Sequence, residues 1–402
     1  MSILNTCLIV VISSLTMYAS VANAARYSLK SSIDAQAAYD DNIFLANNSE
    51  DVVRLTLVPA LSASVSEQNW QQSLDLKAVA NLYSEDQLDN NDAILDYSAV
   101  LGDERKSYNL NAGYNKDSNL NASSLDFGLG DQLVKSTTWN IGPGFQYRWT
   151  ERLSLLFSAN TTTKEYDENT VNGFIGYQAD VGRASASYVL DERTSLLLQT
   201  QYTEYESEDG AFTYELLSNT VGLDHALTEI WSFSGSIGRS SRNSTTVNAQ
   251  PVTIFGQTFT VLDEIDVETT DKVLDLTLSG KYPASNVSLS YLENDQTNSF
   301  GGLNRVRYTR FGFGWKPAER WAYKLSARHD VTQAVLQGNQ NTDRTLNVVS
   351  LSATYKLALN WRLTAKYSFR RLEFDNLAGS TTPESNTLTL GLRYEFRELS
   401  SD

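Results

Sequence analysis

Cysteine is almost absent from the 402-residue sequence, and the only one, Cys7, stands just before an apolar run from Leu8 to Met17. An Ala-Asn-Ala cleavage site follows at residues 22–24, so residues 1–24 are predicted to be a signal peptide and residues 25–402 the mature chain. The apolar run is too short to span a membrane as a helix. The mature chain then contains no cysteine, which excludes disulfides and thiol chemistry.

Long hydrophobic runs and catalytic motifs are also missing. No stretch beyond residue 24 reaches the roughly 18 apolar residues of a membrane-spanning helix, and the mean hydropathy is −0.33. His225 and His329 have no second imidazole or cysteine at metal-ligand spacing, and no G-x-S-x-G nucleophile motif occurs. Acidic clusters such as Asp40 and Asp41 are interpreted as solvated loops rather than cation sites. We therefore expect no enzyme activity, no catalytic residue, no cofactor and no metal.

Positive charge is scarce, because the sequence has 32 Lys and Arg but 48 Asp and Glu, which gives a net charge of −16. This balance argues against nucleic acid as a partner. It is not uniform along the chain: residues 301–402 hold 15 basic and 9 acidic residues, whereas residues 25–300 hold 17 and 39. The C-terminal quarter is therefore the basic part of an acidic protein.

Alternation of apolar and polar residues is abundant, and its clearest example is the last strand, from Asn386 to Phe396. Leu388, Leu390 and Leu392 fall on one face, and polar or small residues fall on the other. Because this pattern recurs along the chain, it predicts a transmembrane β-barrel, apolar towards lipid and polar towards a lumen. The strand closes on an aromatic residue and resembles the C-terminal signal strand of outer-membrane barrels, so we expect barrel-assembly machinery to recognise it.

The predicted fold is all-β, a single antiparallel barrel of 16–18 strands, with 18 preferred. Apolar parity changes near Gly182, which predicts a bulge there. The segments expected to form strands are 25–40, 51–66, 70–84, 92–102, 105–117, 133–148, 152–166, 173–189, 193–206, 211–227, 231–242, 266–281, 285–294, 303–316, 320–332, 344–357, 361–374 and 385–396.

The connections between these strands alternate between two lengths. Short ones such as residues 150–151 alternate with long polar segments such as 117–132, 241–265 and 372–384. Outer-membrane barrels have short periplasmic turns and longer outer loops, so both termini are predicted to be periplasmic, in the outer membrane of a Gram-negative bacterium. Within 241–265, two β-rich segments flank Gly256-Gln257, which predicts a hairpin projecting from the outer mouth around a type II′ turn.

Tryptophan occurs mainly beside the short turns, since six of the seven lie within about two residues of one. An indole ring prefers the membrane boundary, so these six predict a periplasmic girdle. They are Trp70, Trp149, Trp231, Trp315, Trp321 and Trp361. Near the opposite strand ends, Tyr83, Tyr166, Tyr205 and Tyr214 are predicted to contribute to an outer girdle.

The polar face of the predicted strands changes charge along the chain. Parity points Asp34, Asp75, Asp96, Asp224 and Asp275 inward from the earlier strands. The predicted basic inner wall of the last five strands consists of Arg310, Lys324, Arg328, Lys356, Arg362, Lys366, Arg370 and Arg393. This wall predicts a lumen that favours anionic solutes or an acidic polysaccharide. Charged residues that merely fill a wet interior are an equally supported interpretation.

A short motif at the end of the first strand, Ala38-Tyr-Asp-Asp-Asn-Ile-Phe44, carries a family resemblance. Residues 52–65 with Pro59 follow it, and turns of the kind seen at 149–153 and 190–194 recur. These features resemble the outer-membrane β-barrel porin family that accompanies exopolysaccharide and capsule biosynthesis and export systems. The resemblance implies an outer-membrane conduit for polysaccharide, with periplasmic export components as candidate partners and no catalytic residues. On physical grounds alone, residues 40–42 are predicted to form a side-chain-capped turn.

Three functions stay open from the sequence. The first is a conduit for secretion of an exopolysaccharide or capsular polysaccharide, and the second is a general diffusion porin for small, anionic solutes. The third is a structural or surface-interaction barrel, or an enzyme, with a closed lumen. Residues 120–132 are the candidate for a loop that constricts the channel. The expected partners are outer-membrane lipid and the polysaccharide or solute.

Overall fold

The computed structural model describes most of the predicted mature chain. The predicted signal peptide 1–24, the candidate constricting segment 120–132 and parts of the other long loops lie outside the described residues. Those residues are 25–45, 51–118, 134–167, 174–254, 257–297, 303–334, 343–374 and 382–401. Within these ranges, no helix is long and apolar enough to cross a membrane.

In the described part of the chain, eighteen long strands and one short terminal strand form a single antiparallel sheet. The first nine strands are β1 (Arg26–Asp40), β2 (Val52–Glu67), β3 (Trp70–Tyr83), β4 (Asn90–Gly102), β5 (Lys106–Ser118), β6 (Lys135–Arg148), β7 (Leu153–Tyr166), β8 (Tyr177–Asp191) and β9 (Thr194–Ser207). The others are β10 (Phe212–Ala226), β11 (Trp231–Ile254), β12 (Gln257–Lys281), β13 (Ser285–Thr297), β14 (Leu303–Ala318), β15 (Trp321–Ala334), β16 (Arg344–Lys356), β17 (Trp361–Phe374), β18 (Glu384–Glu395) and β19 (Leu399–Ser400). A 3₁₀ turn, η1 (Asp86–Leu88), lies between β3 and β4.

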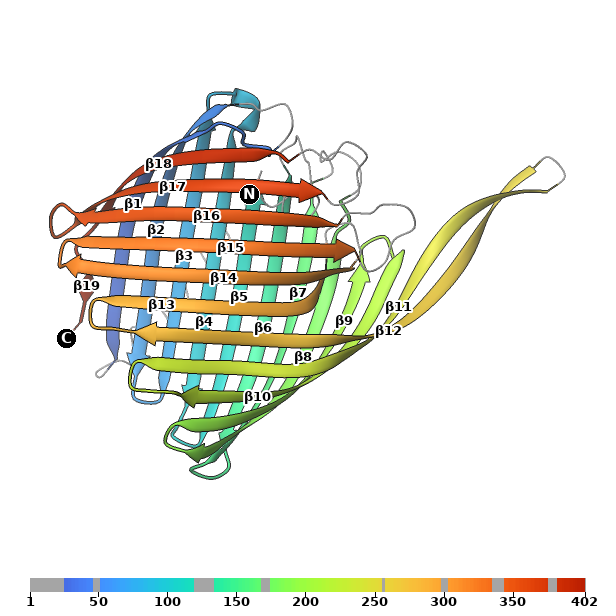
Figure 1. The fold of residues 1–402 in the computed structure, drawn as a ribbon, viewed down its shortest axis with the longest axis horizontal. Coiled ribbons are helices and arrows are strands. Elements are labelled where there is room, and N and C mark those ends of the chain that lie inside the picture. Colours follow the sequence, from blue (N-terminus) through green and yellow to red (C-terminus); the bar gives the residue numbers. More distant parts are fainter. Residues whose placement is uncertain are drawn as a thin grey trace.

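The sheet closes into a barrel because β1 pairs with both β2 and β18 (Figure 1). Nine residue pairs join β1 to β18, from Ser32 opposite Glu395 to Asp40 opposite Thr387. The remaining long strands each pair with their neighbours in sequence. The predicted closed, antiparallel, eighteen-stranded barrel is therefore confirmed.

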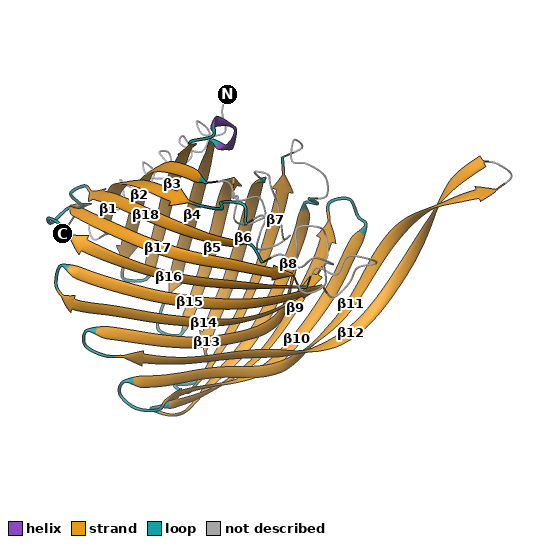
Figure 2. Ribbon diagram, turned by 45° about the horizontal axis from the view of Figure 1, so that its top comes forward, coloured by secondary structure: helices purple, strands orange, loops and turns teal. Residues whose placement is uncertain are grey.

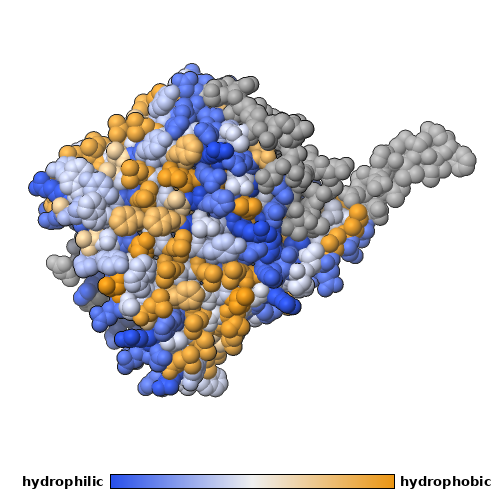
Figure 3. All heavy atoms as spheres, viewed as in Figure 1, coloured by the Kyte–Doolittle hydropathy of each residue, from blue (hydrophilic) through white to orange (hydrophobic). Residues whose placement is uncertain are grey.

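Alternation along each strand gives the wall two different faces. Large apolar side chains lie exposed on the outward face, for example Ile237 at 64% and Leu390 at 54% exposed. Figure 3 shows apolar residues gathered over β13 to β18, between hydrophilic residues at the two ends of the barrel. This is the pattern of a barrel whose exterior meets lipid and whose opposite, polar face lines a lumen.

Short turns and long connections lie at opposite ends of the barrel, here called the short-turn end and the long-loop end. Between β2 and β3, for example, Glu67 pairs with Trp70, which leaves two residues in the turn. β1 begins and β18 ends at the short-turn end, where β19 also pairs with β1. The compartment that this end faces stays a prediction.

Strands β11 and β12 extend well beyond their neighbours at the long-loop end (Figure 2). They pair from Trp231 opposite Gly280 to Ile254 opposite Gln257. The predicted strands 231–242 and 266–281 were therefore too short, and the predicted hairpin within 241–265 is confirmed. The last pair leaves residues 255 and 256 between the strands, one residue earlier than the predicted turn at 256–257. These two residues are not among those described.

The predicted bulge near Gly182 is wrong. β8 pairs without a break through Gly182, which lies opposite Ala159 of β7, and the irregularity of β8 begins at Val189 instead. Apolar parity changes because Tyr177 and Ala179 face inward and pack on a buried aromatic cluster. The change of parity marked a change of environment, not an extra residue in the strand.

Three of the four tyrosines predicted for an outer girdle are buried. Tyr83, Tyr205 and Tyr214 are 8%, 1% and 5% exposed. The rings of Tyr205 and Tyr214 stack with centroids 4.9 Å apart, and Phe212 packs against both. The prediction was wrong because it used distance from the turns alone, whereas strand parity directs these side chains away from the outward face.

Candidate functional site

All eight predicted inner-wall cations lie on one face of β14 to β18. The pairing registers place their side chains on the polar face of the wall. The exposed Trp315, Trp321 and Trp361 lie on the other, outward face. They are Arg310, Lys324, Arg328, Lys356, Arg362, Lys366, Arg370 and Arg393. Their role in selectivity stays a prediction.

Four of the eight are held by carboxylates. Arg328 pairs with Asp330, and Arg370 pairs with Asp40 at 2.7 Å. Near the short-turn end, Arg362 and Arg393 share Glu395 at 2.9 and 3.3 Å. Arg310 instead lies over the ring of Tyr308, 4.2 Å from its centroid. The three lysines form no ion pair with any described residue, so they remain available to a mobile anion.

A cavity of about 300 Å³ lies among these cations towards the long-loop end. It is lined by Arg54, Arg328, Lys366 and Arg370, and Asp40 is the only acidic side chain among the described residues that line it. We call this cavity the basic pocket. Arg328 and Arg370 are neutralised by their carboxylate partners, so among the described residues Arg54 and Lys366 supply the positive charge of the pocket that no carboxylate balances. Its volume is at the lower end of the range of small-molecule sites.

Asp40, from the sequence motif, holds Arg370 in place. Its carboxylate accepts hydrogen bonds from Arg370, Ser385 and Thr387, each between 2.7 and 2.8 Å long. It also accepts the backbone N–H of Asn42 at 3.1 Å, so the predicted side-chain-capped turn is confirmed. The expectation of a solvated acidic loop is wrong for Asp40, whose side chain is 12% exposed.

The next residues of the motif tie the same turn to β18. Asp41 accepts hydrogen bonds from the backbone N–H and the side-chain amide of Asn386, at 2.6 and 2.8 Å. The Asn42 amide donates to the carbonyl of Glu384 at 2.9 Å. Together with Asp40, these residues form what we call the rim latch, which fastens the end of β1 to β18 at the long-loop end.

The segment after β1 folds over the basic pocket. Leu45 is fully buried against Leu346 of β16 and Leu372 of β17. The backbone of Leu45 has φ of 50°, in the left-handed region that costs a non-glycine residue about 1 kcal/mol. Burial of this side chain offsets that cost. An apolar cap of this kind lowers the local polarity and strengthens the field of the charges beneath it.

Arg54 of β2 was not among the predicted inner-wall cations. Its guanidinium carbon lies 5.9 Å from the centroid of the Tyr83 ring, and its Nε is buried without a hydrogen-bond partner among the described residues. The signal was present, because Arg54 alternates with the outward residues Val53 and Leu55 and must face the other way. The earlier strands were predicted to direct aspartates inward, so a cation on their inner face was not expected.

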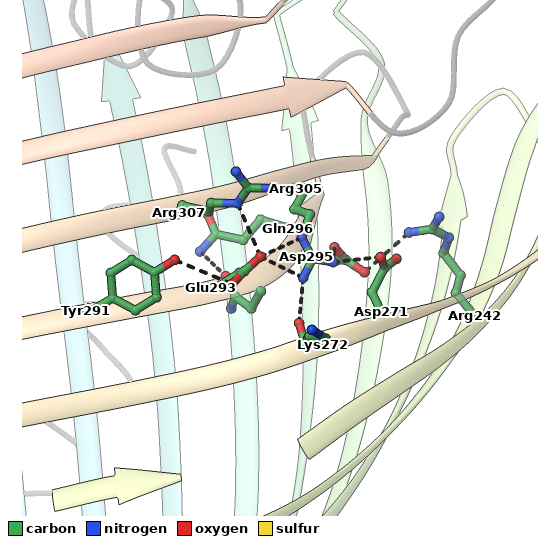
Figure 4. Close-up of polar contacts among 10 residues, drawn as sticks. Arg242, Asp271, Lys272, Tyr291, Glu293, Asp295, Gln296, Arg305 and Arg307 are labelled. Atoms are coloured by element: carbon green, nitrogen blue, oxygen red, sulfur yellow. Dashed lines mark hydrogen bonds and ion pairs between the residues drawn. The ribbon is translucent and has the colours of Figure 1, made fainter. Parts of the chain in front are cut away.

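A second charged cluster lies where β12 and β13 part, and Figure 4 shows it. Arg305 contacts Asp271, Glu293 and Asp295 at 2.8, 3.0 and 3.4 Å. Arg242 pairs with Asp295 at 3.3 Å, and both side chains are 1% exposed. These charges are largely neutralised by one another, so the cluster is a structural bridge rather than a binding site.

The wall opposite the basic pocket is acidic and rich in hydroxyl groups. A cavity of about 370 Å³ there is lined by Asp224, Asp275 and Asp295 among serine, threonine and glutamine side chains, with Arg183 at its side. Two of the five aspartates predicted to face inward, Asp224 and Asp275, lie in it. No cluster of three or more potential metal-ligating side chains occurs in the described ranges.

The six tryptophans predicted for a girdle lie at the short-turn end. Trp70, Trp231, Trp321 and Trp361 begin β3, β11, β15 and β17, Trp149 follows β6, and Trp315 lies near the end of β14. At least four of them are 40% or more exposed, with Trp149 the most exposed at 66%. Their position at a membrane boundary stays a prediction.

Comparison with known proteins gives a likeness in fold only. No family model and no curated protein matches the chain. Among solved structures, OccAB4 of Acinetobacter baumannii has a TM-score of 0.51 at 9% identity, with 93% of this chain and 98% of that chain covered. OccK2 (OpdF) of Pseudomonas aeruginosa has a TM-score of 0.49 at 10% identity, covering 93% and 98%. OpdK of Pseudomonas aeruginosa, solved with vanillate, has a TM-score of 0.48 at 10% identity, covering 94% and 99%.

The class that the fold defines is the large, closed, antiparallel β-barrel. At this strand number the interior is wide enough for water unless loops fill it. The chain shares this fold with OccAB4, and at 9% identity the likeness extends no further.

Proposed function

We propose that the protein is a channel of the Gram-negative outer membrane that selects small anionic solutes at the basic pocket, and that it is not an enzyme. The observation that carries this proposal is a pair of cations, Arg54 and Lys366, that form no ion pair with any residue the structure describes. They lie in a cavity of about 300 Å³ on the polar face of a closed barrel. An arginine fork and a mobile lysine suit a carboxylate, as on a uronic acid.

Conduction through planar bilayers tests the proposal. Under a salt gradient, the reversal potential of the wild-type channel is expected to indicate preference for chloride, and a uronate is expected to block the current. One unit charge about 5 Å from a bound anion in water contributes about 0.8 kcal/mol, so Arg54→Gln and Lys366→Gln should each weaken uronate block about fourfold.

Lys116→Gln is the matched control, because Lys116 lies on the outward face of β5, in line with Tyr108 and Leu110. It should leave block and selectivity unchanged. A wild-type channel that prefers cations, or a block that is indifferent to both pocket variants, would contradict the proposal.

Export of an acidic polysaccharide is a second candidate, and one specific observation favours it. The inward cations continue from the basic pocket to Lys356, Arg362 and Arg393, which pair side by side at the short-turn end. An anionic chain could slide along such a row by exchanging weak contacts. None of the comparisons supports an association with exopolysaccharide. Deleting the gene and measuring cell-surface polysaccharide separates the two candidates.

A further inference from the structure

An open groove of about 790 Å³ crosses the outward face of β7 to β12. Its lining includes small side chains such as Ala184, Ala186 and Thr200, set among the larger and exposed Phe157 and Ile237. A hollow of this kind on the exterior of a barrel has the shape and the chemistry to hold an acyl chain.

Two basic side chains lie at one end of this groove. Arg239 of β11 and Lys272 of β12 both line it, and they are direct cross-strand partners. Their β-carbons are therefore about 5 Å apart, and like charges in this position repel each other. Both side chains are exposed, and neither forms an ion pair within the described part of the chain.

The carboxylates that lie nearest to Lys272 along the strand register already form ion pairs with arginines. Glu293 lies opposite Leu274, two residues along β12 from Lys272, and it is held by Arg305 and Arg307. Asp295 would follow it, but it is buried against Arg242 and Arg305 (Figure 4). On the far side of Lys272, the first outward carboxylate of β12 is Glu268, four residues or about 13 Å along the strand.

Other outward-facing arginines near the long-loop end have a carboxylate of their own. Arg307 lies 3.2 Å from Glu293, and Arg371 lies 2.8 Å from Glu373 and 3.5 Å from Glu384. Arg239 and Lys272 therefore stand out as a cationic pair that an external anion would stabilise. Two cations at this separation can share one phosphate.

The pair also lies at the edge of the apolar band. On the same face, two residues nearer the short-turn end, lie Ile237 and Leu274, and two residues nearer the long-loop end lie Ser241 and Thr270. At such a boundary, lipid phosphates meet the protein, and long basic side chains reach towards them. We propose that the groove and the Arg239–Lys272 pair bind a phosphorylated lipid of the outer leaflet, with an acyl chain in the groove and a phosphate between the two cations. This inference rests on the proposed membrane location.

Lipid retention by the purified full-length barrel tests the proposal. Native mass spectrometry in detergent, with bisphosphorylated lipid A added, is expected to show retained lipid that the double variant Arg239→Ser and Lys272→Ser loses about tenfold. Lys116→Ser, which removes another outward cation on β5, is the control and should retain lipid as the wild type does. The double variant should be at least as heat-stable as wild type without lipid, because it removes a repulsive pair, and it should gain less stability when lipid is added.

Four results would overturn the proposal. The first is lipid retention by the double variant equal to that of the wild type, and the second is equal retention of dephosphorylated and bisphosphorylated lipid A. The third is displacement of the lipid by millimolar inorganic phosphate. The fourth is a groove covered by a second copy of the chain in lipid-free oligomers. Chloride preference and uronate block in the double variant should match wild type. Loss of lipid binding alone and failure of the channel proposal are therefore distinguishable.

Discussion

Two seams in the barrel wall show how differently neighbouring strands can be joined. β1 and β18 lie at opposite ends of the chain, yet nine pairs and the rim latch hold them together up to the long-loop end. β12 and β13 are linked by a short turn, yet only eight pairs join them, over residues 274–281 and 286–293, before they part. Closure of the wall at the long-loop end therefore depends on side chains at the rim rather than on the connectivity of the chain.

The two seams also use charge differently. At β1 and β18 a single carboxylate, Asp40, collects hydrogen bonds from three side chains across a continuous ladder. At β12 and β13 a single guanidinium, that of Arg305, reaches three carboxylates and the carbonyl of Lys272 across a gap. The first arrangement completes a wall that is already paired, and the second replaces missing backbone pairing.

The largest effect is expected from removing the cation that Asp40 of the rim latch holds. Arg370→Met leaves the carboxylate of Asp40 buried without its cation, which costs about 3–5 kcal/mol. Urea unfolding in detergent micelles, followed by tryptophan fluorescence, measures this loss. Arg371→Met is the matched control, because Arg371 makes solvent-exposed ion pairs worth about 0–1 kcal/mol. Equal losses in the two variants would show that the latch contributes nothing beyond a surface ion pair.

A smaller and more local effect is expected at the other seam. Arg305→Met removes charged hydrogen bonds worth about 1.5–3 kcal/mol each, and it should speed amide exchange at residues 294–297 more than elsewhere in β13. Arg307→Met, which removes a half-exposed contact to the same Glu293, should leave that exchange nearly unchanged. Exchange that rises equally along the whole of β13 would mean that Arg305 stabilises the barrel as a whole and not specifically the junction of β12 and β13.

The smallest effect is expected from shortening the projecting hairpin. Removing residues 249–262 and joining Asn248 to Asp263, which pair in register, through a two-residue Asn-Gly turn keeps the ladder below it intact. The free energy of unfolding should change by less than about 0.5 kcal/mol. A loss above about 2 kcal/mol would show that the hairpin stabilises the barrel and does more than extend from it.

The barrel, its strand number and its hairpin were predictable because each rests on a local, period-2 pattern. Ion pairs between residues two apart, such as Arg328 with Asp330 and Arg393 with Glu395, can be predicted in the same way, since both members share a face. The pairing of Arg370 with Asp40 could not be predicted, because it depends on the register with which the last strand meets the first.

The errors have a common physical cause. Tyr83, Tyr205 and Tyr214 were assigned by their distance from a turn, although inward parity and buried neighbours decide their burial. Phe212 packs with Tyr205 and Tyr214, whereas Ile43 and Phe44 cluster with Tyr83. Likewise, Asp40 was assigned to solvent from its sequence neighbours alone, although it is buried. Burial at the long-loop end is set by which segments fold inward over the wall, and that arrangement is tertiary.

The C-terminal extension beyond Phe396 has a consequence for how the barrel behaves among its own copies. β18 covers β1 only from Ser32 onward, and β19 continues the coverage by placing Leu399 opposite Leu29. Bonds between Tyr27 and Ser401 complete it. Without these last residues, the first rungs of β1 would present unpaired backbone groups, which are a template for strand addition by another chain. β19 and Ser401 therefore cover a backbone edge at the short-turn rim that would otherwise be open to strand addition.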